Sequence, residues 1–420
     1  MFRSENGILH IEDVDFREIV KETGTPVYVT SKRLVEENIN DLKRNFDFAF
    51  PLYAVKANNN LTLMRIFAKE EFGADVFSIG ELYLALLSGF DSEKILFNGN
   101  SKSDDEIRAG IRAGVKFSVD SMDELYAISK IAAQEGEEVK IAFRVNPDIS
   151  PETHPKIATG LRTSKFGIPS ENVPDAYETV LELPNVIPAG IHCHIGSQIL
   201  NPDPFVEEIE KMFQITAELE KIGIEIEFLD MGGGFGIDYQ TDGKCRFEIF
   251  ADSIKKAFEE GMERVDSKPE LWIEPGRSLV ANTTVLITKV NSVKRSHYSF
   301  AAVDAGFNTL LRPAMYEAYH RVAVANKMDS EAEEFYTVAG PICESGDIMA
   351  KDRKLPEIKR GDYIAIFDAG AYGFVMGSQY NGRPRCAEVM VDGSRFYVTR
   401  EPESIADLVA KQRIPEELFR

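Results

Sequence analysis

The stretch PLYAVKANNNLTLMRIFAKEEFGADVFSI, residues 51–79, contains one complete unit of the architecture predicted for this chain. An apolar run at 51–57 ends on a lysine, and three asparagines follow it. The segment 62–72 then repeats apolar residues three and four positions apart, which predicts an amphipathic helix, before a second apolar run at 73–79. A strand, a helix and a second strand in this order predict two parallel neighbours in one sheet.

The same alternation continues to about residue 275. Eight strands are predicted, at 51–57, 73–79, 94–98, 115–119, 139–145, 188–195, 225–231 and 271–275. The apolar stripes of the intervening helices are interpreted as core packing. An open, doubly wound sheet is the alternative, but eight units in about 225 residues favour a (β/α)8 TIM barrel.

After about residue 280 the chain shows strand-like runs separated by Gly- and Asp-rich turns, with few helices. This predicts a C-terminal, mostly antiparallel β-sandwich or barrel domain. The early run TPVYVT (25–30) is expected to complete that domain. The expected boundaries are 1–34 for an N-terminal segment that joins the β domain, 35–280 for the barrel and 281–420 for the β domain.

The composition is that of an ordinary globular protein, with 44% hydrophobic and 28% charged residues among 420. The net charge of −21 opposes binding to nucleic acid or an anionic membrane. We find no signal-peptide pattern and no apolar stretch near the roughly 18 residues of a membrane span. Four cysteines without CxxC spacing suit a reducing cytoplasm, where we expect the protein to be.

Chemically active residues follow several predicted strands, and in a barrel these strand ends form the catalytic face. Lys56 ends the first strand, His194 the sixth and Glu274 the eighth. A lysine withdrawn from water has a lowered pKa and can form a Schiff base.

The glycine run GGGFG (232–236) follows the seventh strand, where this fold often holds a phosphate. Alone it is more often a simple turn, but Arg277 could add positive charge and Ser197 a hydroxyl. A phosphate site beside a Schiff-base lysine indicates pyridoxal 5'-phosphate. Neither a GxxxxGK[ST] loop nor a GxGxxG run after the first strand is present.

Glu274 and His194 suit the ring of that cofactor. A carboxylate at position 274 would keep the pyridine nitrogen protonated, and His194 would stack on the ring. His192 and His194 could instead bind a metal, but we expect only one of them to face the rim and no carboxylate to complete the set. We therefore expect no metal and a structural role for His192.

Seven ordered motifs extend these observations: YAVKAN, HCHIGSQ, DMGGGFG, EPGR, LRPAMY, CESGD and DAGAYG. Together they resemble the diaminopimelate decarboxylases, which are fold-type III pyridoxal-phosphate enzymes related to ornithine and arginine decarboxylases and, more distantly, to alanine racemase. The resemblance covers residues 25 to about 390.

The resemblance implies a role for each motif. The implied cofactor contacts are Lys56, His194, Ser197, Gly233, Gly234, Glu274, Gly276, Arg277 and Tyr372. Cys343 resembles the proton donor to the substrate Cα, reaching over from the neighbouring subunit of a homodimer. The implied substrate contacts are Arg277, Arg312, Tyr316, Glu344 and Tyr372. The other cysteines, Cys193, Cys245 and Cys386, are expected to be small buried residues.

The implied activity is that of a lyase that decarboxylates meso-2,6-diaminopimelate at its D-centre, which gives L-lysine in the last step of lysine biosynthesis. Arg312 could fork onto the distal carboxylate and Glu344 could pair with the distal ammonium. A decarboxylase of carboxynorspermidine, ornithine or arginine is the nearest alternative. A racemase is opposed by Glu274. A non-catalytic carrier is opposed by the β domain and by Cys343.

Overall fold

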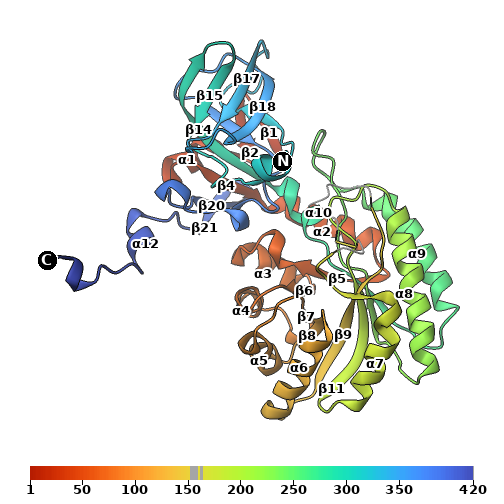
Figure 1. The fold of residues 1–420 in the computed structure, drawn as a ribbon. Helices are drawn as coiled ribbons and strands as arrows, with labels where there is room; N and C mark the ends of the chain where they lie inside the picture. Colours follow the sequence, from red (N-terminus) through yellow and green to blue (C-terminus); the bar gives the residue numbers. More distant parts are fainter. Residues whose placement is uncertain (152–158, 161–163, 420) are drawn as a thin grey trace. The chain divides into compact units, whose positions relative to one another are not determined.

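The computed structural model describes residues 1–151, 159–160 and 164–419, and the chain divides into two compact units. The barrel unit holds residues 38–237 and 245–279, and the β unit holds 1–37, 238–244 and 280–420. The chain passes between them within α2 (Lys32–Asn45), on both sides of the segment 238–244, and within α10 (Arg277–Val280). Figure 1 labels many of the elements of both.

Eight parallel strands form the wall of the barrel unit (Figure 1). They are β5 (Ala49–Ala54), β6 (Gly73–Val76), β7 (Ile95–Phe97), β8 (Lys116–Val119), β9 (Val139–Asn146), β11 (Val186–Cys193), β12 (Phe228–Asp230) and β13 (Glu270–Ile273). The wall closes because β13 pairs with β5 and β8 with β9, and a short β10 (Ile168–Pro169) adds to β9. The eight predicted strands and the closed barrel are confirmed.

The helices of the barrel unit follow the strands in turn. They are α3 (Leu61–Lys69), α4 (Ile79–Ser88), α5 (Asp104–Ala113), α6 (Met122–Glu135), α7 (Val173–Glu182), α8 (Asp203–Lys221) and α9 (Phe247–Met262). Side chains at the N-cap begin several of them, since Ser78, Ser103 and Ser121 each accept a backbone N–H of the first turn. Asn60 does the same for α3, which gives the third asparagine of 58–60 a role.

Apolar side chains fill the interior of the barrel. The cluster consists of Leu52, Leu96, Ala142, Ala189, Phe228 and Trp272. The rings of Phe228 and Trp272 stack with centroids 4.0 Å apart. Asp75, Asp230 and Glu274 lie at or just after the carboxyl ends of β6, β12 and β13, so the fold gathers these acids at one rim.

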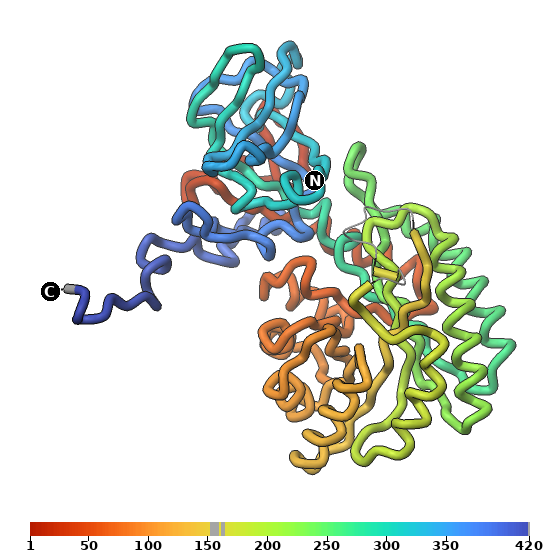
Figure 2. Tube along the Cα trace, in the orientation of Figure 1, coloured from red at the N-terminus to blue at the C-terminus, as the bar shows by residue number. Residues whose placement is uncertain are grey.

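In the β unit, strand β4 (Val27–Ser31) lies inside the sheet. It pairs antiparallel with β14 (Thr284–Arg295) and parallel with β20 (Ala387–Asp392), as predicted for the early segment 25–30. Figure 2 shows the red N-terminal trace running among the green and blue traces of this unit. The unit is thus completed by the start of the chain.

The other strands extend this sheet in the order β18-β17-β15-β14-β4-β20-β21. They are β15 (Ser299–Val303), β17 (Glu334–Ala339), β18 (Ile348–Leu355) and β21 (Arg395–Arg400), with β19 (Tyr363–Ile366) pairing β14 and β16 (Val322–Val324). Most pairings are antiparallel, and β15–β17 and β4–β20 are parallel.

The sequence did not predict the small sheet of β1 (Phe2–Glu5), β2 (Ile8–Ile11) and β3 (Val14–Asp15), nor α1 (Phe16–Thr23). Their apolar side chains share a core with β4 and β14. The short helices α11 (Arg312–Tyr316) and α12 (Ile405–Val409) complete the unit. Among the helices of the described ranges, none is long and apolar enough to cross a membrane.

Candidate active site

Lys56 lies at the rim of the barrel, one turn beyond the strand that carries it. Strand β5 stops at Ala54, and Lys56 sits in the short 3-10 helix η1 (Val55–Ala57). Its Nζ is 2.5 Å from Oδ2 of Asp75, which is fully buried at the end of β6, and 4.8 Å from the ring centroid of Phe77. A buried carboxylate thus holds the lysine in place.

Asn98 connects this ion pair to Glu274, which follows β13, the strand that pairs with β5. The amide of Asn98, just past β7, donates to Asp75 Oδ1 at 2.5 Å and to Glu274 Oε1 at 2.8 Å. All three side chains are buried, and Glu274 follows β13. A continuous polar path therefore runs from Lys56 to Glu274. The sequence analysis missed Asp75 and Asn98, although both are polar residues at the ends of apolar strands.

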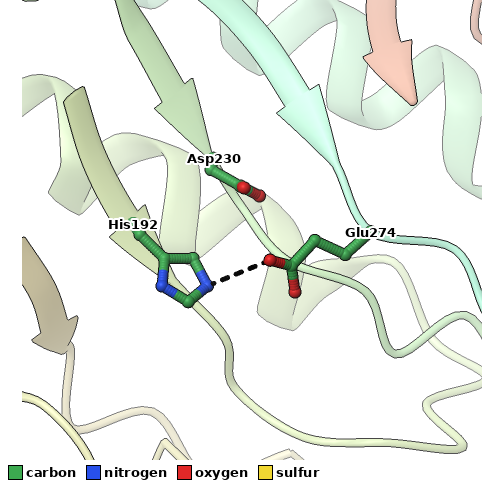
Figure 3. Close-up of side chains that lie close together, drawn as sticks. All are labelled: His192, Asp230 and Glu274. Carbon is green, nitrogen blue, oxygen red and sulfur yellow. Dashed lines mark ion pairs between the residues drawn. The ribbon is translucent and has the colours of Figure 1, made fainter. Parts of the chain in front are cut away.

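His192 and Asp230 lie beside Glu274 (Figure 3). His192 Nε2 is 3.6 Å from Glu274 Oε1, while its Nδ1 is 2.6 Å from Ser118 Oγ. Asp230 Oδ1 accepts the backbone N–H of Gly232 at 2.8 Å. Possible ligand atoms of His192, Asp230 and Glu274 lie within 4.8 Å of one another.

One expectation about the histidines is therefore wrong, namely that no carboxylate completes a possible metal-binding set. That only one histidine faces the rim stays a prediction, because His194 lies beyond the end of β11 at Cys193. Carboxylates from the neighbouring strands β12 and β13, Asp230 and Glu274, complete a set that no single motif reveals. The absence of a metal stays a prediction.

Burial controls the charge of these groups. Loss of water contact, together with the carboxylates of Asp75 and Asp230, raises the pKa of Glu274 well above its ordinary value. Burial likewise raises the pKa of Asp230 to about 8. Burial and the positive charge of Lys56 hold the pKa of His194 well below its ordinary value, so this imidazole is neutral at pH 7. A cation placed beside Glu274 would favour its carboxylate form.

The glycines after β12 pack against the other strand ends. A Cβ on Gly233 would lie 2.1 Å from the carbonyl oxygen of Glu274, and one on Gly234 would lie 2.5 Å from that of Gly196. Gly234 also has φ of +114°, which side chains rarely adopt. Nearby, Arg277 Nη2 donates to Ser197 Oγ at 3.0 Å. Close backbone approach and a buried guanidinium thus occur together.

The predicted substrate residues, apart from Arg277, belong to the β unit. Arg312 is buried in α11, where Nη1 is 2.8 Å from Nε2 of His320 and the guanidinium lies 4.5 Å from the ring centroid of Tyr239. His320 donates through Nδ1 to Phe367 O at 2.9 Å, which leaves Nε2 to accept from Arg312. Arg312 is therefore fixed in one orientation. His320 and Tyr239 were missed, because neither belongs to LRPAMY.

The remaining predicted residues also lie in this unit. Tyr316 ends α11, and Tyr372 adopts φ of +55° in the segment after β19. Cys343 and Glu344 are exposed between β17 and β18, whereas Cys193, Cys245 and Cys386 are buried as predicted. The structure thus gathers the predicted cofactor contacts, apart from Tyr372, in the barrel unit. It gathers the predicted substrate contacts, apart from Arg277, in the β unit.

The chain is similar to known proteins along its whole length. A family model described as "Pyridoxal-dependent decarboxylase, pyridoxal binding domain" matches residues 32–281. A diaminopimelate decarboxylase of Archaeoglobus fulgidus is 63% identical over 100% of both chains. One of Methanothermobacter thermautotrophicus is 43% identical over 99% of this chain and 98% of that protein.

Solved structures of diaminopimelate decarboxylases are also similar to this chain. The diaminopimelate decarboxylase of M. jannaschii in complex with L-lysine is 41% identical and superposes with a TM-score of 0.94. That alignment covers 100% of this chain and 99% of the other. A lysine/ornithine decarboxylase of Vibrio vulnificus, at 21% identity and a TM-score of 0.78 over 90% of this chain and 97% of that one, shares the fold.

Proposed function

The chain belongs to the diaminopimelate decarboxylases, within the pyridoxal-dependent decarboxylase family, and we propose that it works through the barrel rim and the Arg312 and Cys343 segments described above. It is a lyase that uses pyridoxal 5'-phosphate to remove CO2 from the D-centre of meso-2,6-diaminopimelate, which leaves L-lysine. This is the last step of lysine biosynthesis by the diaminopimelate route.

The residues of the rim fit the cofactor. Lys56 offers the amine for a Schiff base, and Gly233, Gly234 and Gly276 let the backbone approach a phosphate closely. Ser197 and Arg277 supply a hydroxyl and a positive charge next to them. When bound, pyridoxal 5'-phosphate supplies the electron-withdrawing ring that permits decarboxylation of an amino acid.

The path from Lys56 through Asp75 and Asn98 to Glu274 is the observation that carries this proposal. It sets the distance between the amine that holds the cofactor at one end and the acid that meets the pyridine nitrogen at the other. Because Glu274 is buried, its carboxylate is stable only with a positive charge beside it, and a protonated pyridine provides that charge. Neutral His194 offers a face for stacking on the ring.

Arg312 selects the substrate in this proposal. Diaminopimelate carries a second carboxylate and a second ammonium far from the reacting centre. A guanidinium whose plane is fixed by His320 and Tyr239 can meet a carboxylate through two parallel hydrogen bonds. Tyr316, on the same short helix, adds a hydroxyl, and Glu344 pairs with the distal ammonium.

Cys343 donates the proton that replaces CO2 at the substrate Cα. We propose that Cys343 and Glu344 reach the rim from the second subunit of a homodimer, and that the enzyme works in the cytoplasm.

A mixture of inactive Lys56→Ala and Cys343→Ala enzymes tests whether the two subunits share each active site. After subunit exchange each mixed dimer has one intact site, so up to about a quarter of the activity should return. No recovery after verified exchange would contradict a shared site.

Turnover on a panel of amino acids tests the reaction itself. Diaminopimelate should give lysine, and ornithine, arginine and carboxynorspermidine should react far more slowly. Changing Arg312 to Lys should raise KM for diaminopimelate by about ten- to a hundredfold, since a bidentate charged contact becomes a single one. Faster turnover of ornithine, or an unchanged KM, would contradict the choice of substrate.

A further inference from the structure

The segments that carry Cys343 and Glu344 touch two residues to which the proposed function gives no role. Tyr380 and Asn381 begin the 3-10 helix η7 (Tyr380–Gly382). Asn381 Oδ1 accepts the backbone N–H of Cys343 at 3.0 Å, and Asn381 Nδ2 donates to Cys343 Sγ at 3.2 Å. Tyr380 Oη donates to Glu344 Oε1 at 2.8 Å and is 3.7 Å from Cys343 Sγ.

The backbone of Asn381 is specialised for these contacts. Its φ of 57° and ψ of 25° place it in the left-handed region, which asparagine tolerates better than most residues. This conformation turns the amide back onto Cys343, so one side chain binds both the nitrogen and the sulfur of that residue. The ring of Tyr380 is fixed separately, because it stacks on Phe307 at 5.8 Å and 16°.

Each of the two segments, 342–344 and 379–381, is also held by hydrogen bonds to a carboxylate outside the segment. Asp347 accepts the backbone N–H of Ile342 at 2.7 Å and of Phe307 at 2.6 Å, which pins the Cys343 segment. Glu403 accepts from Gln379 Nε2 at 2.8 Å and from the backbone N–H of Arg385 at 2.9 Å, which pins the Tyr380 segment.

Arg385 Nε adds a further bond to Glu403 at 2.8 Å, and these donors lower the pKa of Glu403 to about 2. Glu403 therefore stays ionised at neutral pH and keeps accepting from Gln379 and Arg385. Although Cys343 and Glu344 are exposed, the segments around them are held in a defined geometry.

We propose that Tyr380 and Asn381 are positioning residues for proton transfer by Cys343 and for the grip of Glu344 on the substrate. The inference rests on the roles proposed above for Cys343 and Glu344. Asn381 aims the thiol and stabilises the negative charge that grows on sulfur. Tyr380 fixes the Glu344 carboxylate at a constant distance from that thiol.

The proton transfer explains why a donor to sulfur matters. The S–H bond of Cys343 breaks, a C–H bond forms at the substrate Cα, and the electron pair of the S–H bond stays on sulfur. Asn381 Nδ2–H then faces a thiolate, to which its hydrogen bond is stronger than to a thiol. Water afterwards returns a proton to sulfur. The Asn381 hydrogen bond stabilises the thiolate more than the thiol. Removing it should therefore lower kcat and leave substrate binding unchanged.

Tyr380 acts on binding as well. Its hydroxyl remains a donor at neutral pH, because hydrogen bonding to Glu344 and the proximity of Cys343 raise its pKa to about 12. A donor on Oε1 sets the direction in which the Glu344 carboxylate meets an ammonium. Loss of the hydroxyl should therefore change KM in addition to kcat.

Two substitutions of Asn381 test the first role in the holoenzyme. Asn381→Gly keeps the left-handed backbone and removes the amide. Asn381→Asp keeps the shape and puts negative charge against sulfur. We expect kcat to fall about tenfold in the glycine variant, and further in the aspartate variant, with KM within twofold of wild type. The solvent deuterium isotope effect on kcat should rise, because proton transfer becomes slower. An unchanged kcat in both variants would overturn the role of Asn381.

Tyr380→Phe tests the second role, since phenylalanine keeps the ring stacked on Phe307. We expect KM for diaminopimelate to rise about tenfold and kcat to fall. Tyr397→Phe is the matched control, because Tyr397 is 52% exposed on β21 of the same unit, and it should behave as wild type. A Tyr380→Phe enzyme with wild-type KM would overturn the role of Tyr380.

The background of Cys343→Ala separates this inference from the function on which it rests. If Cys343 is the donor, Cys343→Ala is slow and adding Asn381→Gly slows it no further. Full activity of Cys343→Ala would remove the proposed donor and the role of Asn381 with it. A slow Cys343→Ala enzyme beside a fully active Asn381→Gly enzyme would overturn this inference alone.

Discussion

Hydrogen bonds hold Glu274 at the rim of the barrel and Glu344 beside Cys343. Water reaches Glu344 but not Glu274. Asp75 and Glu274 are buried, whereas Cys343 and Glu344 are exposed. At the rim, loss of water contact dominates the pKa of Glu274, so each charge depends on its neighbours. At the Cys343 segment, direct hydrogen bonds set the geometry. A substitution at the rim should therefore alter the charges of several neighbouring residues. A substitution near Cys343 should alter only the residues that it directly contacts.

Loss of the lysine should have the largest effect. Lys56→Ala removes the amine that holds the cofactor and leaves Asp75 buried without its cation. We expect kcat/KM to fall on the order of 10³-fold or more, with loss of the visible absorbance of lysine-bound cofactor. Lys69→Ala, an exposed lysine at the end of α3, is the control and should be unchanged.

The same chemical change in the two regions gives the sharpest comparison. Glu274→Gln should lower kcat by about 10²- to 10³-fold, because a neutral amide cannot stabilise a pyridinium in a buried site. Glu344→Gln should instead raise KM for diaminopimelate by about ten- to a hundredfold, with a smaller change in kcat. Steady-state kinetics of both variants check this, and equal effects on kcat would contradict the contrast.

Asn98→Ala should disturb the rim without touching the cofactor amine. Two buried carboxylates, Asp75 and Glu274, lose the donor that they share. Each lost hydrogen bond to a buried group costs about 1–3 kcal/mol of folding free energy. We also expect kcat to fall about tenfold, because Glu274 loses its fixed orientation. Thermal unfolding and kinetics measure the two effects, and a variant with wild-type values of both would show that the path is not needed.

The smallest expected effect is a change in folding stability with pH, which Asp230 at the rim should cause. Asp230 titrates near pH 8 when folded and near its ordinary 3.8 when unfolded, so the folded state binds the extra proton between these values. Its contribution to stability is full below about pH 4 and is lost as the pH rises to about 8, at up to about 1.4 kcal/mol per pH unit. Asp230→Asn cannot ionise, so cofactor-free enzyme with this change should lose less stability between pH 5 and 8. Parallel curves would contradict the assignment.

The eight barrel strands were predictable because each rests on local apolar runs and on helices of ordinary spacing. Strand β4 was predictable because its composition matches the β unit. In contrast, the contacts of Asn98 were not, since it bonds to Glu274, 176 residues away, only after the barrel closes. His192 was misjudged because its carboxylate neighbours come from other strands. Asn381 gives no signal at all before its backbone conformation is known.

The position of strand β4 in the sequence affects how the chain folds during synthesis. Thr30 in β4 contacts Thr284 in β14, 254 residues later. At about 5–20 residues per second, the ribosome needs roughly 13–50 s to deliver that partner. During this interval the barrel is synthesised and can fold, while Val27, Tyr28 and Val29 have no sheet to join. An apolar strand with two open edges is prone to aggregate. Because the chain is interleaved, this strand stays without its sheet partners until β14 is synthesised.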